Sequence, residues 1–370
     1  MQVYLDNAAT TPIANEVFES MKPYLTNQFG NPSSLHSFGR HARAAVESAR
    51  KSIAQCLGVA PAEIVFTSGG TEANNTFIQS ISKAYGQLIT TKTEHHAVLE
   101  VAEALEKKGV KVIYLDVDRE GNPDYDQLEL SLKKMPSAVS IMYVNNETGV
   151  ILDTERVARL CGENQSYFHT DGVQAVGHLP LNLSDSGIHG LSASSHKFHG
   201  PKGTGFMFIK SNHRISPMIL GGPQERELRA GTENVAGIVG TARALELASD
   251  QLTEDINYVN TLKDQCVSLL KAGVSDVSFN GSADNGIYSI LNVSLPPSPK
   301  NEMMLFKLDL KGVAVSGGSA CSSGASQVSH VLREMKSDID RGALRFSFSR
   351  YNTPDEIAYA VNALTETLSD

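Results

Sequence analysis

Apolar residues in the N-terminal part of the chain form short runs that are separated by longer amphipathic stretches. The short runs predict strands at 63–67, 87–91, 111–115, 138–144, 166–169, 190–193 and 205–209. Helical spacing of apolar residues lies between several of these runs, for example at 97–108 and 155–162. Because strands and helices alternate, the pattern predicts an α/β fold in which helices flank a mostly parallel sheet.

The C-terminal part of the chain has a different pattern. A polar, glycine-rich stretch at 221–234 is followed by a predicted long helix at 235–272. Beyond it we expect an α+β arrangement, with strands near 286–293 and 344–348 and helices near 301–311 and 354–368. A chain of 370 residues exceeds the size at which a single core stops growing. We therefore predict a large domain at 15–250 and a small α+β domain that joins 1–14 to 251–370.

Polar residues of types that bind ligands or take part in catalysis lie at the carboxyl ends of the predicted strands. They are Thr71, His95, Asn146, Asp171 and Lys197. Ligands of α/β proteins bind in the crevice at this edge of the sheet, so these residues indicate one site. Lys197 lies among small and polar residues, which suits an amine that forms a Schiff base with pyridoxal phosphate. A solvated surface lysine is the competing interpretation of the same stretch.

A glycine-rich turn, Ser68-Gly-Gly-Thr-Glu72, lies between a predicted strand and a predicted helix. The free N–H groups and the dipole at a helix N-terminus attract phosphate. An ordinary N-cap by Ser68 or Thr71 explains the same residues, and the turn matches neither the P-loop nor GxGxxG. Asp171 likewise is either the partner of a protonated pyridine nitrogen or an N-cap.

Composition and charge narrow the classes of function. The chain is 41% hydrophobic and 20% charged, which is typical of a globular protein. A net charge of −9 without a long basic run argues against nucleic acid binding. No apolar run has the length of a membrane span, and residues 1–12 lack the pattern of a signal peptide, so we expect a cytoplasmic protein. The adjacent His95 and His96 lack the spacing of metal ligands, and no metal is predicted.

The four cysteines fall into two groups. Cys56, Cys161 and Cys266 lie in segments with helical periodicity and are predicted to be buried, inert thiols. Cys321 instead lies in a stretch of glycine and serine that has no apolar face to bury it. A thiol in such a loop suits a reducing compartment and a reactive role.

Short motifs follow one another along the whole chain. They are Leu5-Asp-Asn-Ala-Ala-Thr-Thr-Pro, Thr67-Ser-Gly-Gly-Thr-Glu-Ala-Asn-Asn, Glu94-His-His-Ala-Val, Val144-Asn-Asn-Glu-Thr-Gly, His169-Thr-Asp-Gly-Val-Gln, Ser194-Ser-His-Lys, Arg229-Ala-Gly-Thr-Glu-Asn, Gly318-Ser-Ala-Cys-Ser-Ser and Leu344-Arg-Phe-Ser. In kind and order they resemble those of cysteine desulfurases of the nitrogen-fixation/iron–sulfur-cluster type, within the class V aminotransferase family. The resemblance implies the fold type I of pyridoxal phosphate enzymes, with a mostly parallel seven-stranded sheet in the large domain.

The resemblance also assigns roles to residues. It implies that Lys197 forms the Schiff base, that Asp171 pairs with the pyridine nitrogen, and that His95 stacks on the ring and takes part in catalysis. The remaining cofactor ligands are Gln174 at the phenolic oxygen, Gly70, Thr71, Ser194 and His196 at the phosphate, and Thr232 at the phosphate bound by the other subunit. Asn146 and Arg345 hold the substrate carboxylate, a task that suits the arginine fork. Cys321 is the nucleophile that receives sulfur.

The implied enzyme is a homodimer with shared active sites, whose cofactor is pyridoxal 5'-phosphate. It takes sulfur from L-cysteine, gives L-alanine, and passes the persulfide on Cys321 to acceptor proteins such as an iron–sulfur scaffold. One departure is visible, since the Leu-Glu-Pro-like stretch that usually follows the cysteine loop is replaced by 324–332. The alternatives are a selenocysteine lyase, which uses similar chemistry on a heavier atom, and an aminotransferase of the same family, which needs no thiol. A third alternative is a non-enzymatic sulfur carrier or scaffold, which does not need Lys197, Asp171 and Gln174 together.

Overall fold

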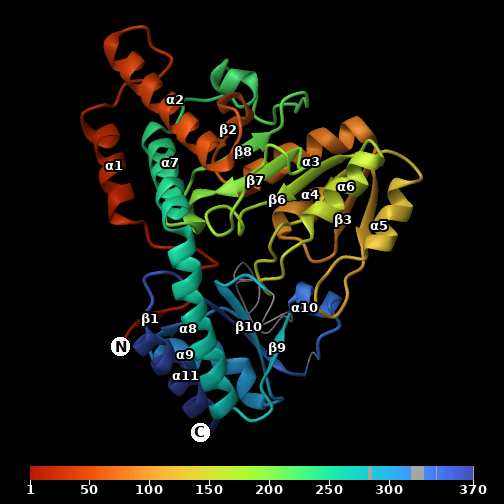
Figure 1. Cartoon of the computed structure of the whole chain (residues 1–370), viewed down its shortest axis with the longest axis vertical. Coiled ribbons are helices and arrows are strands. Elements are labelled where there is room, and N and C mark those ends of the chain that lie inside the picture. Colours follow the sequence, from red (N-terminus) through yellow and green to blue (C-terminus); the bar gives the residue numbers. More distant parts are fainter. Residues whose placement is uncertain (282–285, 318–328, 339, 370) are drawn as a thin grey trace.

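A seven-stranded sheet of order β2-β8-β7-β6-β5-β3-β4 organises the larger part of the molecule (Figure 1). The computed structural model describes residues 1–281, 286–317, 329–338 and 340–369. The strands are β2 (Ile64–Thr67), β3 (Gln87–Thr91), β4 (Lys111–Leu115), β5 (Ala138–Ser140), β6 (Tyr167–Asp171), β7 (Gly190–Ser194) and β8 (Gly205–Ile209). Strand β8 is antiparallel to both of its neighbours, while β4, β3, β5, β6 and β7 pair in parallel. The predicted α/β fold with a mostly parallel sheet is confirmed.

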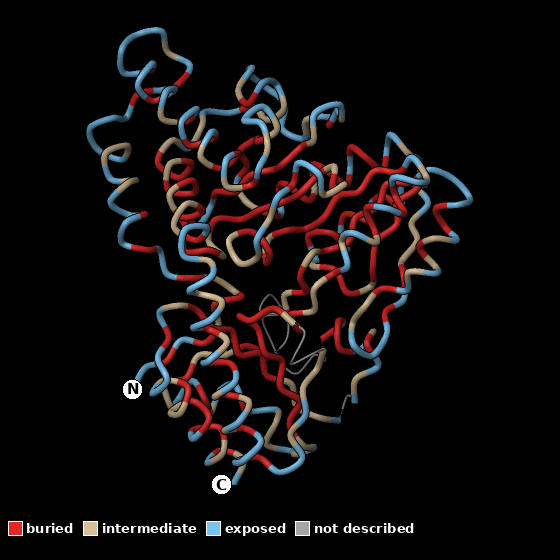
Figure 2. Tube along the Cα trace, in the orientation of Figure 1, coloured by how far each residue is buried: buried red, intermediate tan, exposed pale blue. Residues whose placement is uncertain are grey.

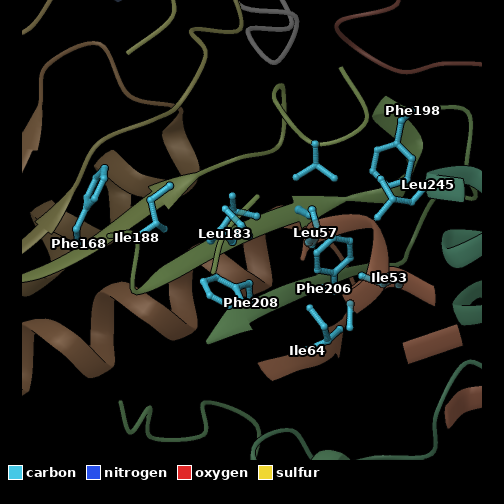
Figure 3. Packing of buried hydrophobic residues seen from close by; sticks show 14 of the residues in the cluster. Ile53, Leu57, Ile64, Phe168, Leu183, Ile188, Phe198, Phe206, Phe208 and Leu245 are labelled. Atoms are coloured by element: carbon cyan, nitrogen blue, oxygen red, sulfur yellow. The ribbon is translucent and has the colours of Figure 1, made fainter. Parts of the chain in front are cut away.

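Alternating side chains of this sheet enter two apolar layers. On β2, Ile64 and Phe66 enter one layer while Val65 between them enters the other, as the pleat of a strand requires. Helices α3 (Gly70–Tyr85) and α4 (His96–Glu106) cover the layer of Val65. The other layer, shown in Figure 3, is covered by α2 (Ser37–Leu57), α5 (Tyr125–Leu132), α6 (Thr154–Glu163) and α7 (Val235–Asp250), with α1 (Asn15–Thr26) packed on α7.

The rest of the chain packs around a three-stranded antiparallel sheet of order β12-β10-β9 (Figure 1). Its strands are β9 (Ser278–Asn280), β10 (Ile290–Leu295) and β12 (Gly342–Ser347), and its helices are α8 (Leu252–Gly273), α9 (Met304–Leu310), α10 (His330–Glu334) and α11 (Pro354–Ser369). Strand β1 (Val3–Tyr4) pairs in parallel with β11 (Val313–Ala314), so the N-terminal residues join this part. Both parts have buried interiors, as Figure 2 shows.

The structure corrects the prediction of one long helix at 235–272. Two helices, α7 and α8, meet at Gln251, whose backbone leaves the helical conformation with φ −103° and ψ 4°. The side chain of Gln251 accepts a hydrogen bond from Arg350, which follows β12, so the break lies where the two parts of the molecule meet. The division of the chain at residue 250 stays a prediction. Helices α1 and α5 are elements that the hydrophobic pattern did not predict.

Burial of the cysteines follows the prediction for two of the three described residues. Cys161 and Cys266 are buried, and burial raises the pKa of each thiol to about 12. Cys56 is only partly buried, so the prediction was wrong on this point, although burial still raises the pKa of the Cys56 thiol. Cys321 lies outside the described residues.

Across the described ranges, no helix combines the length and the hydrophobicity that crossing a membrane requires.

Candidate active site

A cavity of about 270 Å³ lies where the carboxyl ends of β6 and β7 meet the N-terminus of α3. The predicted site residues that line it are Gly70, Thr71, His95, Asn146, Asp171, Gln174, Ser194, His196, Lys197 and Arg345. Thr232 is exposed and does not line it, and Cys321 lies outside the described residues. The cavity is also lined by residues that the sequence did not single out, namely Ala8, Ala9, Asn74, Ala97, Met142, Val144 and Val173.

One end of the cavity is formed by the first turn of α3. The residue that precedes the helix, Gly69, has φ +149° and provides no side-chain cap, so the alternative interpretation, an N-cap by Ser68 or Thr71, is wrong. A Cβ on Gly70 would approach Val173 Cγ2 to 2.5 Å, and glycine therefore keeps the helix close to the chain that follows β6. The first N–H groups of a helix lack intrahelical partners and favour anions. We call this region the phosphate end.

A carboxylate lies beside the phosphate end, and its charge is compensated. Glu72 accepts hydrogen bonds from Arg229 Nε at 2.9 Å and from the Ser68 N–H at 2.8 Å. Burial acts in the opposite direction, but these two donors and the Arg229 charge lower the pKa of the Glu72 carboxyl. Arg229 belongs to the segment that leads to Thr232, so the ion pair ties that segment to the first turn of α3.

Lys197 lies at the end of the short 3₁₀ helix η2 (Ser195–Lys197), directly after β7. Its Nζ donates to the carbonyl oxygens of Ala8 at 2.7 Å and Ala9 at 2.8 Å. Gln174 Nε2 also donates to the Ala8 carbonyl, at 2.9 Å. The N-terminal segment therefore provides carbonyl acceptors that hold two of the predicted cofactor ligands in place.

Asp171, the last residue of β6, is buried and has partners on both carboxylate oxygens. Asn74 Nδ2 donates to Oδ2 at 2.6 Å, and the Val173 N–H donates to Oδ1 at 3.0 Å. The bond from the Val173 N–H resembles the one that an N-cap at Asp171 would accept, but no helix follows Asp171, so the N-cap interpretation is wrong. The role of Asn74 was not predicted from the sequence, although Asn74 lies three residues after Thr71 and so shares a face of α3 with it.

Two histidines of the cavity wall are neutral at pH 7. His95 caps α4, with Nδ1 accepting from the Ala97 N–H at 3.0 Å, and burial lowers the pKa of His95. His196 Nδ1 lies 3.0 Å from Thr10 Oγ1, and burial together with the nearby Lys197 charge lowers the pKa of His196 to about 4. His95 therefore presents an uncharged ring to the cavity.

Glu94 supports the wall that carries His95. It is fully buried, and its Oε1 accepts from Thr91 Oγ1 at 2.8 Å and from the Met142 N–H at 2.9 Å. Burial raises the pKa of the Glu94 carboxyl to about 8, so the group is largely protonated at pH 7. Glu94 could not be recognised from the sequence, because a glutamate beside two histidines shows no sign of burial.

Arg345, on β12, lines a second region of the cavity, which we call the carboxylate end. Its side chain is 1% exposed. Nη1 donates to the Asn146 carbonyl at 2.7 Å and Nη2 donates to Asp6 Oδ1 at 2.8 Å, while the buried Nε has no partner among the described residues. A buried donor without an acceptor is costly in a folded protein, and an anionic ligand removes that cost.

Comparison with known proteins shows the family to which the chain belongs. The sequence profile of the aminotransferase class-V family matches residues 3–359. The chain belongs to this family. A cysteine desulfurase IscS of Dictyoglomus turgidum is 45% identical over 98% of this chain and 93% of its own. The family resemblance of the motifs is thereby confirmed.

Solved structures agree with the fold. A NifS-like protein superposes with a TM-score of 0.93 at 37% identity and covers 100% of both chains. A structure described as SspA in complex with cysteine has a TM-score of 0.83 at 32% identity, over 95% of this chain and 100% of that one. The predicted pyridoxal phosphate fold type I is confirmed.

Enzymes of this family use pyridoxal 5'-phosphate, and the cavity fits that cofactor. It combines a helix N-terminus that favours an anion, an amine on Lys197, a carboxylate on Asp171 and an uncharged planar ring on His95. Asn74 Oδ1 and Arg345 Nε are buried without partners in the described part of the chain, as expected for a cavity that receives a polar ligand.

Proposed function

We propose that this protein is a pyridoxal phosphate-dependent cysteine desulfurase, which releases L-alanine from L-cysteine and keeps the sulfur as a persulfide on Cys321. The observation that carries the proposal is that the Lys197 amine and the Arg345 guanidinium line one cavity. The two groups suit a cofactor bound through an amine and a substrate bound through a carboxylate. A relative that is 45% identical carries the name cysteine desulfurase, and cysteine is named in the description of a similar structure.

Different residues of the cavity are proposed to bind different groups of the cofactor. In the proposed complex Lys197 Nζ would hold the aldehyde carbon, Asp171 would pair with the ring nitrogen and His95 would lie against the ring. Gln174 would donate to the phenolic oxygen. The phosphate would be held by Gly70, Thr71, Ser194 and His196. When bound, pyridoxal phosphate supplies an electron sink for bond cleavage at the substrate Cα.

The protein residues then orient the substrate and move its protons. Arg345 and Asn146 hold the carboxylate of L-cysteine, which fixes the direction of its Cα–H bond. Lys197 Nζ, once its own covalent bond is released, accepts the Cα proton as a general base. The carbonyls of Ala8 and Ala9 accept hydrogen bonds from the resulting ammonium group.

Sulfur transfer completes the reaction. The Cys321 thiolate attacks the sulfur of L-cysteine, so that an S–S bond forms, the substrate Cβ–S bond breaks, and its electron pair passes to the substrate carbon skeleton. Protonation of that skeleton gives L-alanine. Only the thiolate is a competent nucleophile, so Cys321 must lose its proton before attack.

The test is a single turnover without a reductant or acceptor. Loaded protein and excess L-cysteine are expected to give one alanine per site in a burst, with one extra sulfur on the protein by mass spectrometry. Cys321→Ser is expected to give neither product, and the control Cys56→Ser is expected to give both. Undiminished alanine from Cys321→Ser contradicts the persulfide mechanism, and a 2-oxo acid product favours an aminotransferase.

Three further parts of the proposal concern partners and location. We propose a homodimer in which Thr232 serves the phosphate of the other subunit, which agrees with its exposure in the single chain. Sulfur acceptor proteins such as an iron–sulfur scaffold take the persulfide. A reactive free thiol fits a reducing compartment, so we propose the cytoplasm.

Mixed dimers test the shared site. Lys197→Ala and Thr232→Ala subunits are each expected to be impaired alone. Unfolded together and refolded as mixed dimers, they are expected to regain activity, because one site of each mixed dimer carries neither substitution. Activity no higher than the mean of the two separate variants contradicts a cross-subunit role of Thr232.

A further inference from the structure

Asn74 is a buried polar residue of the cavity wall to which neither the motifs nor the proposed reaction assigns a task. It is 1% exposed, and its Nδ2 donates to Asp171 Oδ2 at 2.6 Å. It lies on α3, four residues after Gly70 and three after Thr71. The helix that forms the phosphate end therefore also contacts the carboxylate proposed to bind the ring nitrogen.

The chemistry of the pair fixes the orientation of the amide. A carboxylate oxygen only accepts, so the group of Asn74 that faces Asp171 must be the NH₂. The Oδ1 of Asn74 then points elsewhere, and it is buried with no partner in the described residues. A fold stabilised by burial alone would place an apolar side chain here, because an unpaired buried acceptor is costly. The cost of leaving Oδ1 unpaired indicates that Asn74 serves the site through its contact with Asp171 and not the stability of the fold.

Asn74 completes the restraint on Asp171. The N–H of Val173, in the turn that follows β6, donates to Oδ1, and Asn74 on α3 donates to Oδ2. With one donor on each oxygen the plane of the carboxylate is set before a ligand enters. Each oxygen keeps a second lone pair for a further donor.

We propose that Asn74 is a positioning residue that orients the Asp171 carboxylate toward the ring nitrogen of the bound cofactor. The inference rests on the proposed function, because it requires pyridoxal phosphate in this cavity. One rigid element, α3, then sets both the phosphate end and the ring-nitrogen contact. Three residues of an α-helix rise by about 4.5 Å, so Thr71 and Asn74 act at two separate places along the cofactor.

The test measures cofactor binding rather than turnover. Apoprotein is titrated with pyridoxal 5'-phosphate, and the visible absorbance of the loaded protein is followed against pH. Asn74→Leu is expected to raise the Kd for the cofactor about tenfold, the equivalent of one hydrogen bond. It is also expected to shift the pH midpoint of the visible absorbance, because the ring nitrogen senses the orientation of Asp171. Gln79→Leu, an exposed position of the same helix, is the control and is expected to change neither value.

Two further variants separate positioning from stability. Asn74→Asp keeps the size of the side chain but sets two carboxylates against each other, and it is expected to raise the Kd more than Asn74→Leu. Thr71→Val is expected to raise the Kd without moving the pH midpoint, because it acts at the phosphate end. Thermal unfolding of each apoprotein confirms that the variants fold.

The outcomes are distinct. If Asn74→Asp or a folded Asn74→Leu binds the cofactor with the parent Kd and the parent pH midpoint, Asn74 does not position Asp171. If Asn74→Leu raises the Kd but leaves the midpoint unchanged, the role is only structural and the inference is overturned. A parent protein that does not bind pyridoxal phosphate contradicts the proposed function itself, which the same titration detects first.

Discussion

The two ends of the cavity are built in different ways. The phosphate end comes from neighbouring residues at the start of α3, and its attraction for an anion comes from backbone N–H groups. The carboxylate end is assembled from Asp6, Asn146 and Arg345, which are far apart in the sequence and meet through side chains and one carbonyl. The first end is fixed by local structure, whereas the second depends on long-range packing.

The difference has an energetic consequence. The phosphate end carries one compensated carboxylate, Glu72, at its border. The carboxylate end contains a cation with 1% exposure that is paired with Asp6. The Nε of Arg345 is buried without a partner among the described residues, so this guanidinium keeps a donor for the carboxylate of a substrate. We therefore expect substitutions at the carboxylate end to affect turnover more than substitutions at the phosphate end.

Lys197 lines the same cavity but belongs to neither end, and its loss is expected to have the largest effect. Lys197→Ala removes both the covalent attachment and the general base, so alanine formation from L-cysteine is expected to fall about 10³-fold or more. Lys202→Ala, an exposed lysine nearby, is the matched control and is expected to keep the parent rate. Comparable activity of Lys197→Ala and Lys202→Ala contradicts the proposed role.

The carboxylate end is tested by Arg345→Lys. The lysine keeps the positive charge but loses the fork, and kcat/KM for L-cysteine is expected to fall about 100-fold through loss of charge-assisted hydrogen bonds. The Kd for pyridoxal phosphate is expected to stay within about twofold, because Arg345 is not among the residues proposed to bind the cofactor. Arg341→Lys, whose partner Asp276 is exposed, serves as control. Equal losses of cofactor and substrate binding in Arg345→Lys contradict the separation of the two ends.

The phosphate end is tested by Thr71→Val. Loss of one hydroxyl is expected to weaken cofactor binding about tenfold, measured by titration of the apoprotein. Once the protein is saturated with cofactor, KM for L-cysteine is expected to equal that of the parent. A changed KM at full saturation shows that the two ends are coupled more tightly than their structure indicates.

The wall that carries His95 is tested by Glu94→Gln, with the smallest expected effect. The pKa of the Glu94 carboxyl is raised from 4.5 to about 8 in the folded protein, so the native state holds a proton that the unfolded chain releases. The stability from this group is complete below pH 4.5 and is lost as the pH rises toward 8. Glu94→Gln, which stays neutral, is expected to unfold a few degrees above the parent at pH 8, and thermal scans at pH 5 are expected to show a smaller difference. A difference that does not grow between pH 5 and pH 8 contradicts the raised pKa.

The contrast between local structure and long-range packing also separates the features that the sequence predicts from those that it does not. Strands such as β3 and β8 match the predicted ranges because a buried strand is a short apolar run between turns. The strand-end position of Asp171 and Lys197 was predicted by the same alternation. The contacts of Lys197 with Ala8 and Ala9 were not predicted, because backbone carbonyls carry no sequence signal and these partners lie 189 and 188 residues away.

Two other features escaped prediction for physical reasons. The break at Gln251 has no proline or glycine to mark it, and it coincides with a tertiary contact with Arg350 that the sequence does not show. Asn74 resembles any polar residue of a helix until the fold places Asp171 beside it. The motifs predicted the residues that contact a ligand, whereas the residues that support them depend on packing.

The most direct test of the central claim is the site of covalent cofactor attachment. Loaded protein is reduced with borohydride, digested, and examined by mass spectrometry. We expect the mass of the reduced cofactor on the peptide that contains Lys197 and not at Lys202, and we expect no label on Lys197→Ala. Label at another lysine, or an unlabelled Lys197 in a protein that retains the cofactor, contradicts Schiff-base formation by Lys197.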